Sequence, residues 1–167
     1  MSTLLEKQIK VNRIVTTSIE HARAIEDPGR AKIVEMLYRQ ALSADQITSA
    51  LKKAGYKKAL TTVRHHLEIL KNSGLIEIAK IEESRGAIKK YYGTSTKLLD
   101  FQTPEDFDSK YSKIIDKTST KIEKIIKGLT PKTIKSNGKT SKEYSQYLVV
   151  EIVNRAMTNV LENSEKK

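Results

Sequence analysis

The stretch LTTVRHHLEILKNSGLIEI, residues 60–78, contributes most to the prediction of the fold. In its first part, apolar residues recur at spacings of four and three, which is the pattern of a helix with one buried face; they are Val63, Leu67 and Leu70. Gly74 ends this helix, and Ile76 and Ile78 begin an alternating pattern typical of a strand. The stretch therefore predicts a short amphipathic helix over about residues 60–72 that leads directly into β-structure.

Two further helices are predicted before this stretch. Asp27 and Pro28 are a typical N-cap and first helical residue, so a helix is expected to begin there. Ser43 and Gln46 have the spacing of a capping box and begin the next helix, which Gly55 ends. The residues of these two helices that we expect to face inward are Ile33, Val34, Leu37, Tyr38, Ile47, Ala50 and Leu51.

A β-hairpin is predicted after the helix at 60–72. The alternation slips by one residue before Ile81, a Ser-Arg-Gly turn follows at 84–86, and residues 88–94 form a second strand rich in β-branched and aromatic side chains. Three helices followed by a hairpin are the order of a winged helix-turn-helix, here over residues 28–95. The predicted fold class is therefore mainly α with a small β-hairpin wing.

Positive charge is concentrated in this region. The chain of 167 residues has 31 Lys and Arg against 20 Asp and Glu, a formal charge of +11. Residues 52–90 hold ten of the basic and four of the acidic side chains, so +6 of the excess lies in under a quarter of the chain. This distribution favours a polyanionic partner through attraction and counterion release.

The helix at 60–72 carries side chains that suit a DNA groove. Its exposed face is predicted to carry Thr61, Thr62, Arg64, His65 and Glu68. A helix of this size fits the major groove, where Arg pairs with guanine and Thr contacts a thymine methyl or a phosphate. Lys57 and Lys58 precede the helix and are expected to hold phosphates. Arg85, at the hairpin tip, is expected to enter the minor groove.

Three stretches resemble the winged helix-turn-helix domain of ArsR-like transcription regulators. The first stretch, DPGRAKIVEMLYRQALSADQI at 27–47, is similar to the family's helix of the form DPxRxxIL. The recognition helix, of the form TVxxHLxxLxxxGLI, is similar to residues 60–78, and the wing to RGAIKKYYGTS at 85–95. The second stretch is the most specific, although related winged-helix families share it. The resemblance covers residues 27–92, about two-fifths of the chain.

The resemblance implies roles for individual residues. The positions at which the family contacts bases correspond to Thr61, Thr62, Arg64 and His65. The His-Leu pair of the family's scaffold corresponds to His66 and Leu67. The family's wing positions correspond to Arg85 and Lys89. The complete set expected to bind DNA is Lys57, Lys58, Thr61, Thr62, Arg64, His65, Arg85, Lys89 and Lys90. Family members act as homodimers on palindromic sites. This chain departs from the family in its longer connection at 51–60, its lack of the metal-sensing cysteines and its longer C-terminal region.

Amphipathic helices are predicted on both sides of the domain. One covers residues 2–26, a second has a heptad seam over 104–129, and a third covers 141–162. The residues expected in the dimer contact are Tyr111, Ile115, Ile122, Ile125, Leu129, Tyr144, Leu148 and Ile152. The alternative to dimerisation is that the heptad seam over 104–129 packs within its own domain. The predicted organisation is an N-terminal helix for dimerisation or packing at 1–26, a DNA-binding domain at 27–95 and a helical dimerisation region at 104–163.

The sequence gives no positive indication of an enzyme. The chain has no Cys, which excludes thiolate metal sites, disulfides and cysteine nucleophiles. It has no Gly-rich phosphate loop, zinc-ligand spacing or Ser/His/Asp arrangement. The adjacent His65 and His66 point about 100° apart on a helix and do not suit one metal ion. We expect no catalytic residue, no cofactor and no metal.

The function predicted from the sequence is that of a sequence-specific regulator of transcription that binds double-stranded DNA as a homodimer. The alternatives are a sequence-neutral architectural DNA-binding protein and a winged-helix module that binds protein. No stretch approaches the ~20 apolar residues of a membrane span, and charges interrupt the apolar residues of the N-terminus, unlike a signal peptide. A cytoplasmic, DNA-associated protein without a membrane partner is expected, and the sequence leaves any small-molecule effector unspecified.

Overall fold

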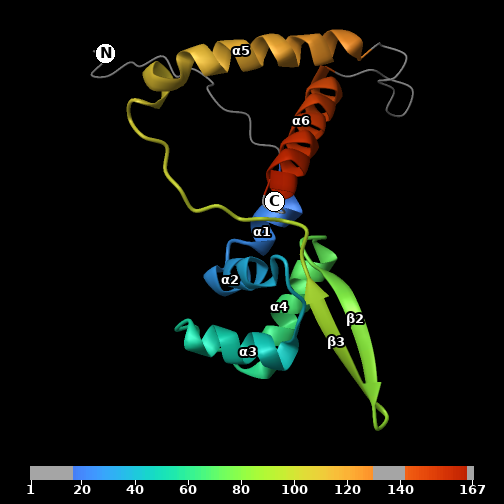
Figure 1. Cartoon of the computed structure of the whole chain (residues 1–167). Helices are drawn as coiled ribbons and strands as arrows, with labels where there is room; N and C mark the ends of the chain where they lie inside the picture. Colours follow the sequence, from blue (N-terminus) through green and yellow to red (C-terminus); the bar gives the residue numbers. More distant parts are fainter. Residues whose placement is uncertain (1–16, 130–141, 165–167) are drawn as a thin grey trace, which may run out of the picture. The chain divides into compact units, whose positions relative to one another are not determined.

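The computed structural model describes residues 17–129 and 142–164. The chain divides into two compact units, one of which spans Thr17–Phe101 (Figure 1). The described part of the other unit consists of residues 102–129 and 142–164. The first unit contains the whole of the domain expected at 27–95.

The first unit is a winged helix-turn-helix in which four helices precede a long hairpin (Figure 1). Its helices and strands are α1 (Ile19–Ala24), α2 (Pro28–Leu37), β1 (Leu42–Ser43), α3 (Ala44–Lys53), α4 (Leu60–Asn72), β2 (Glu77–Ser84) and β3 (Ala87–Gly93). The strands form an antiparallel sheet in the order β1-β3-β2. The predicted fold class, mainly α with a small β wing, is confirmed.

Local sequence signals determine where two of the helices begin. Asp27 caps α2, because its side chain accepts a hydrogen bond of 3.0 Å from the backbone N–H of Arg30. A capping box begins α3. Ser43 Oγ accepts from the backbone N–H of Gln46 at 3.4 Å, and Gln46 Oε1 accepts from the backbone N–H of Ser43 at 2.9 Å. Both predicted N-caps are confirmed, and they satisfy amides that the helices leave unpaired.

Glycine ends α3 and α4. Gly55 and Gly74 have φ angles of +89° and +81°, a left-handed conformation that glycine adopts without steric cost. After each glycine, the next amide donates to the carbonyl five residues earlier, at 2.8 Å and 3.1 Å. This is the Schellman arrangement of a helix C-terminus. Both predicted stops are confirmed, and the second one turns the chain from α4 towards β2.

The core of the first unit lies between α2, α3, α4 and the base of the sheet. Its fully buried apolar side chains are Ile33, Val34, Leu37, Ile47, Leu51, Val63, Leu67 and Leu70. Two residues differ from the expectation. Ala50 is only half-buried. Tyr38 lies outside α2 in extended backbone and bridges to Thr94, because the chain leaves the helix there for a turn at Arg39, whose φ is +62°.

The sheet contains one strand that the sequence did not reveal. The predicted slip is confirmed, since the register shifts between Ile78 and Lys80 on β2. The unexpected strand is β1, in which Leu42 and Ser43 pair with the last part of β3. A strand of two residues has no periodicity to detect, and the same Ser43 also begins α3.

The predicted helix at 2–26 is wrong at its described end. Its first part lies outside the described residues, but α1 begins only at Ile19. Ser18 adopts extended backbone and accepts a 3.0 Å hydrogen bond from the amide of His21, so it is an N-cap and not a helical residue. The buried residue of α1 is Ala24, whereas Ile19 is 67% exposed. The role of residues 1–26 in dimerisation stays a prediction.

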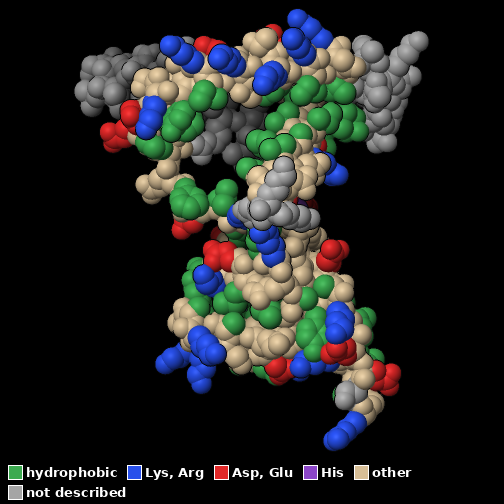
Figure 2. Space-filling view, in the orientation of Figure 1, with side chains coloured by type: hydrophobic (Ala, Val, Ile, Leu, Met, Phe, Trp, Pro, Cys, Tyr) green, Lys and Arg blue, Asp and Glu red, His purple; other side chains and the backbone are tan. Residues whose placement is uncertain are grey.

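The described part of the second unit contains α5 (Phe107–Gly128) and α6 (Lys142–Ser164), which contact each other. They correspond to the helices predicted at 104–129 and 141–162, but α5 begins three residues later than predicted, at Phe107, and Leu129 follows it as its C-cap. No residue of α5 is buried within the chain. Figure 2 shows Lys side chains along one edge of α5 and hydrophobic side chains along another. In the described part of the chain, no helix meets the length and hydropathy of a membrane span.

The capping box gives a test of the fold. Replacing Ser43 by Ala should lower the free energy of unfolding by about 1 kcal/mol, because the amide of Gln46 loses its acceptor at a buried position. Urea denaturation measures the change. The control is Ser49→Ala at an exposed position of the same helix, which should cost less than about 0.5 kcal/mol. Equal losses in the two variants would contradict the capping role.

Candidate nucleic-acid interface

Helix α4 presents one face to the core and the opposite face to solvent. Val63, His66, Leu67 and Leu70 are the buried residues of this helix. On the other side, Thr61, Arg64, His65 and Glu68 are exposed, and Thr62 is half-buried. The predicted base-contacting residues therefore occupy a surface that a groove could reach.

The N-terminal end of α4 is open to a ligand. Ala59 occupies the N-cap position, and no side chain caps the amides of the first turn. Free amides at a helix N-terminus suit a phosphate. Lys57 is exposed, while Lys58 is half-buried and packs at the start of α2. A Cβ added at Gly29 would lie 3.6 Å from Lys58 Cε, so the glycine leaves room for this lysine.

The hairpin forms a wing with a basic residue in its turn. Arg85 and Gly86 connect β2 to β3 with φ angles of +49° and +77°. Two consecutive positive φ angles belong to the turns that fit the twist of a two-residue hairpin. Arg85 is exposed there, as predicted.

The two faces of the wing differ in chemistry. On one face, the ammonium groups of Lys80 and Lys89 lie 5.6 Å and 5.5 Å from the ring centre of Tyr91. Lys80 also donates to the carboxylate of Glu82. This hydrogen bond, with a second from Tyr91, holds the pKa of Glu82 below its ordinary value. Lys89 is therefore positioned by an aromatic ring, whereas the alternation of the strand places Lys90 on the opposite face.

An open groove of about 290 Å³ runs between α4 and β3. Its lining residues are Ser43, Ala44, Asp45, Arg64, Glu68, Ile88, Lys89, Lys90 and Tyr92. The structure thus brings Arg64 of the helix together with Lys90 of the wing, whereas Lys89 also touches the groove but has its ammonium group beside Tyr91 on the other face of the strand. The predicted residues Lys57, Lys58 and Arg85 lie outside this groove.

The apolar part of the wing was not predicted from the sequence. Ile88 is 68% exposed and lines the groove, and Ile81 is 58% exposed. The signal was present, because Ile88 and Lys90 lie four and two residues before the buried Tyr92 and share its face. The buried end of β3 thus indicates which residues of its exposed end face the groove.

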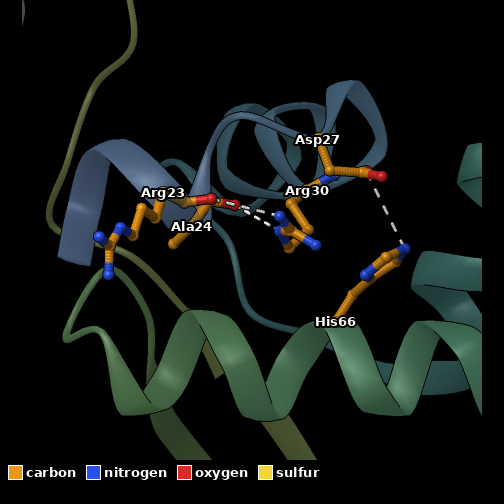
Figure 3. Close-up of polar contacts among 5 residues, drawn as sticks. All are labelled: Arg23, Ala24, Asp27, Arg30 and His66. Carbon is orange, nitrogen blue, oxygen red and sulfur yellow. Dashed lines mark hydrogen bonds and ion pairs between the residues drawn. The ribbon is translucent and has the colours of Figure 1, made fainter. Parts of the chain in front are cut away.

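A buried histidine lies behind the exposed face of α4. His66 is 6% exposed, and neither ring nitrogen has a hydrogen-bond partner. Its Nε2 lies 4.0 Å from Asp27 Oδ1, beyond hydrogen-bond distance (Figure 3). Burial lowers the pKa of His66 below 6.5, and the nearby charges of Arg30 and Lys58 lower it further, against the opposing effect of Asp27. The imidazole is therefore neutral at pH 7, which agrees with a scaffold role.

Arg30 belongs to the scaffold as well. Its guanidinium donates to the carbonyl oxygens of Ala24 and, at 3.2 Å, of Arg23 (Figure 3). These bonds join the end of α1 to α2. No group of three or more His, Cys, Asp or Glu side chains that could hold a metal ion occurs among the described residues.

Stability should depend on pH through His66. In the unfolded chain, His66 takes up a proton near pH 6.5, whereas in the folded chain it does so only at lower pH because its pKa is lowered. The free energy of unfolding should therefore fall as the pH falls below 6.5. The fall should level off below the folded pKa. Thermal denaturation from pH 7.5 to 5 should show a weaker dependence in His66→Leu than in the parent protein. The control His65→Leu removes an exposed histidine from the same helix, and an identical pH profile for both variants would contradict the effect of burial.

Comparison with known proteins relates part of the chain to a family. Residues 27–77 match the family model described as bacterial regulatory protein, arsR family. The match runs from the N-cap of α2 through α3 and α4 to the first residue of β2. No curated protein matches the chain. Residues 27–77 are therefore similar to an ArsR-family helix-turn-helix domain, and this match supports a DNA-binding transcription regulator.

Proposed function

We propose that the protein is a sequence-specific regulator of transcription that binds double-stranded DNA as a homodimer. The observation that carries the proposal is the groove between α4 and β3, where Arg64 of the helix lies with Lys90 of the wing. A guanidinium on the exposed face of a helix can pair with guanine in the major groove, and lysines beside it can neutralise the flanking phosphates.

The proposed mode of binding places α4 in the major groove. Arg64 and His65 then reach base edges, and Thr61 and Thr62 contact a thymine methyl or a phosphate. The uncapped amides at the start of α4, with Lys57 and Lys58 before them, hold the backbone. The wing straddles a second stretch of backbone, with Arg85 directed to the minor groove.

The exposed apolar faces of α5 and α6 support a homodimer. In α5, Ile115 and Ile125 are 41% and 39% exposed, and in α6 Ile152 is 38% exposed. Tyr111, Ile122, Leu129, Tyr144 and Leu148 are the remaining proposed contacts, and all are half-buried. Burial of these faces against a second copy would remove apolar area from water, at about 25 cal/mol per Å². A twofold dimer also matches a palindromic operator.

Selection of bound sequences from a random duplex library tests the proposal. An enriched inverted repeat with half-sites about 10–11 base pairs apart is expected. Binding without enrichment would indicate a sequence-neutral architectural protein. No binding at physiological salt would indicate a module that binds protein instead.

The base-reading role of Arg64 can be separated from general attraction. Arg64→Ala should weaken binding to the selected site by about 1–3 kcal/mol and change binding to random DNA much less. The comparison variant is Lys58→Gln, which should weaken binding to both DNAs alike and reduce the salt slope by about 1. Fluorescence anisotropy across a salt titration measures both effects. Equal losses on both DNAs for Arg64→Ala would show that it contacts only the backbone.

The dimer contact can be tested on one helix. Ile122→Glu places a charge in the heptad seam of α5 and should convert the dimer to a monomer, since an unpaired carboxylate is costly to bury. The control Thr120→Glu makes the same change of charge on the opposite side of α5 and should leave the dimer intact. Analytical ultracentrifugation reads the result, and a dimeric Ile122→Glu would exclude this seam as the contact.

A further inference from the structure

Glu68 is an acidic residue at the centre of a basic surface. Helix α4 has two basic residues, Arg64 and Lys71, and Glu68 is its only acid. Glu68 lies seven residues after Thr61 and three after His65, so these three residues share the outward face of the helix. Its side chain is 52% exposed and lines the groove beside Arg64.

Lys71 holds the carboxylate of Glu68 in place. The ammonium of Lys71 lies 3.0 Å from one carboxylate oxygen and 3.1 Å from the other. An ionised carboxylate offers about four acceptor sites, so this contact leaves acceptor capacity for a further donor. The ion pair restricts the side chain of Glu68 but leaves its carboxylate accessible to a ligand.

A carboxylate facing DNA opposes binding unless it meets a hydrogen-bond donor. Double-stranded DNA carries one negative charge per ~1.7 Å of its axis, so Glu68 weakens the general attraction that the surrounding basic residues provide. In the major groove, the donors on the base edges are the amino groups of cytosine and adenine, and a carboxylate accepts from the cytosine amino group. Glu68 therefore favours one base while it disfavours random DNA.

We propose that Glu68 is a specificity-determining residue that accepts a hydrogen bond from the amino group of a cytosine. The inference rests on the proposed function and adds a position that Arg64 does not read. The two side chains lie one helical turn apart on the groove side of α4, and their chemistries are complementary. The guanidinium donates to guanine, and the carboxylate accepts from cytosine.

The test is Glu68→Gln, which keeps the shape of the side chain and removes its charge. A glutamine amide pairs with adenine, so selection from the random library should show one position of the half-site change from cytosine to adenine. The preference for cytosine over adenine at that position should fall by about tenfold. Affinity for random DNA should rise, because a charge that repels phosphates is lost.

The matched control is Glu35→Gln on α2. Glu35 also forms an ion pair with a lysine three residues away, in this case Lys32 at 2.7 Å. The same change of charge there should leave the selected sequence unchanged. If Glu68→Gln keeps the parental preference at every position, or differs from Glu35→Gln only in general affinity, the reading role of Glu68 is overturned. A parent protein without any sequence preference would instead overturn the proposed function, and the role of Glu68 with it.

Discussion

The structure of the first unit depends on the burial of one face of α4. Val63, Leu67 and Leu70 are fully buried against α2 and α3, and complete burial of such a side chain contributes about 1.5–3 kcal/mol. The helical period then determines what faces outward. Once these three residues are inside, Arg64 and Glu68 must lie on the solvent side. The chemistry of the exposed face thus follows from the packing of the buried one.

The same packing sets the environment of His66. The imidazole is enclosed with the apolar residues of α4 and finds no hydrogen-bond partner, which is normally costly at a buried site. Asp27 Oδ1 lies 4.0 Å from Nε2 of His66, but this carboxylate already accepts a hydrogen bond from the backbone N–H of Arg30 as the cap of α2. That hydrogen bond lowers the pKa of Asp27, so the carboxylate remains ionised beside a neutral histidine. The start of α2 and the buried face of α4 are therefore linked by electrostatics and packing, without a direct bond.

Much of this unit could be predicted from the sequence, because its signals are local. The capping box at Ser43, the glycine stops at Gly55 and Gly74, and the apolar spacing of α4 each act within a few residues. Features that depend on distant partners were missed. Strand β1 exists only because β3 lies beside it. The start of α1 was missed for another reason, because its N-cap, Ser18, stands inside a continuous apolar pattern that predicts an uninterrupted helix. The groove also needed the structure, since Arg64 and Ile88 belong to different elements and meet only through the packing of the wing.

The distribution of charge explains why the helix and the wing need different roles. Residues 52–71 hold six basic side chains and one acid, whereas residues 77–93 hold four basic side chains and three acids. Most of the local excess therefore surrounds α4, where it can attract phosphates over a Debye length. In the wing, Lys80 is paired with Glu82 and both Lys80 and Lys89 lie beside Tyr91, so charge there is largely balanced and held in fixed positions. In the proposed complex with DNA, such a wing would contribute orientation through its shape and its few directed cations, and the helix and the loop before it would provide the general attraction.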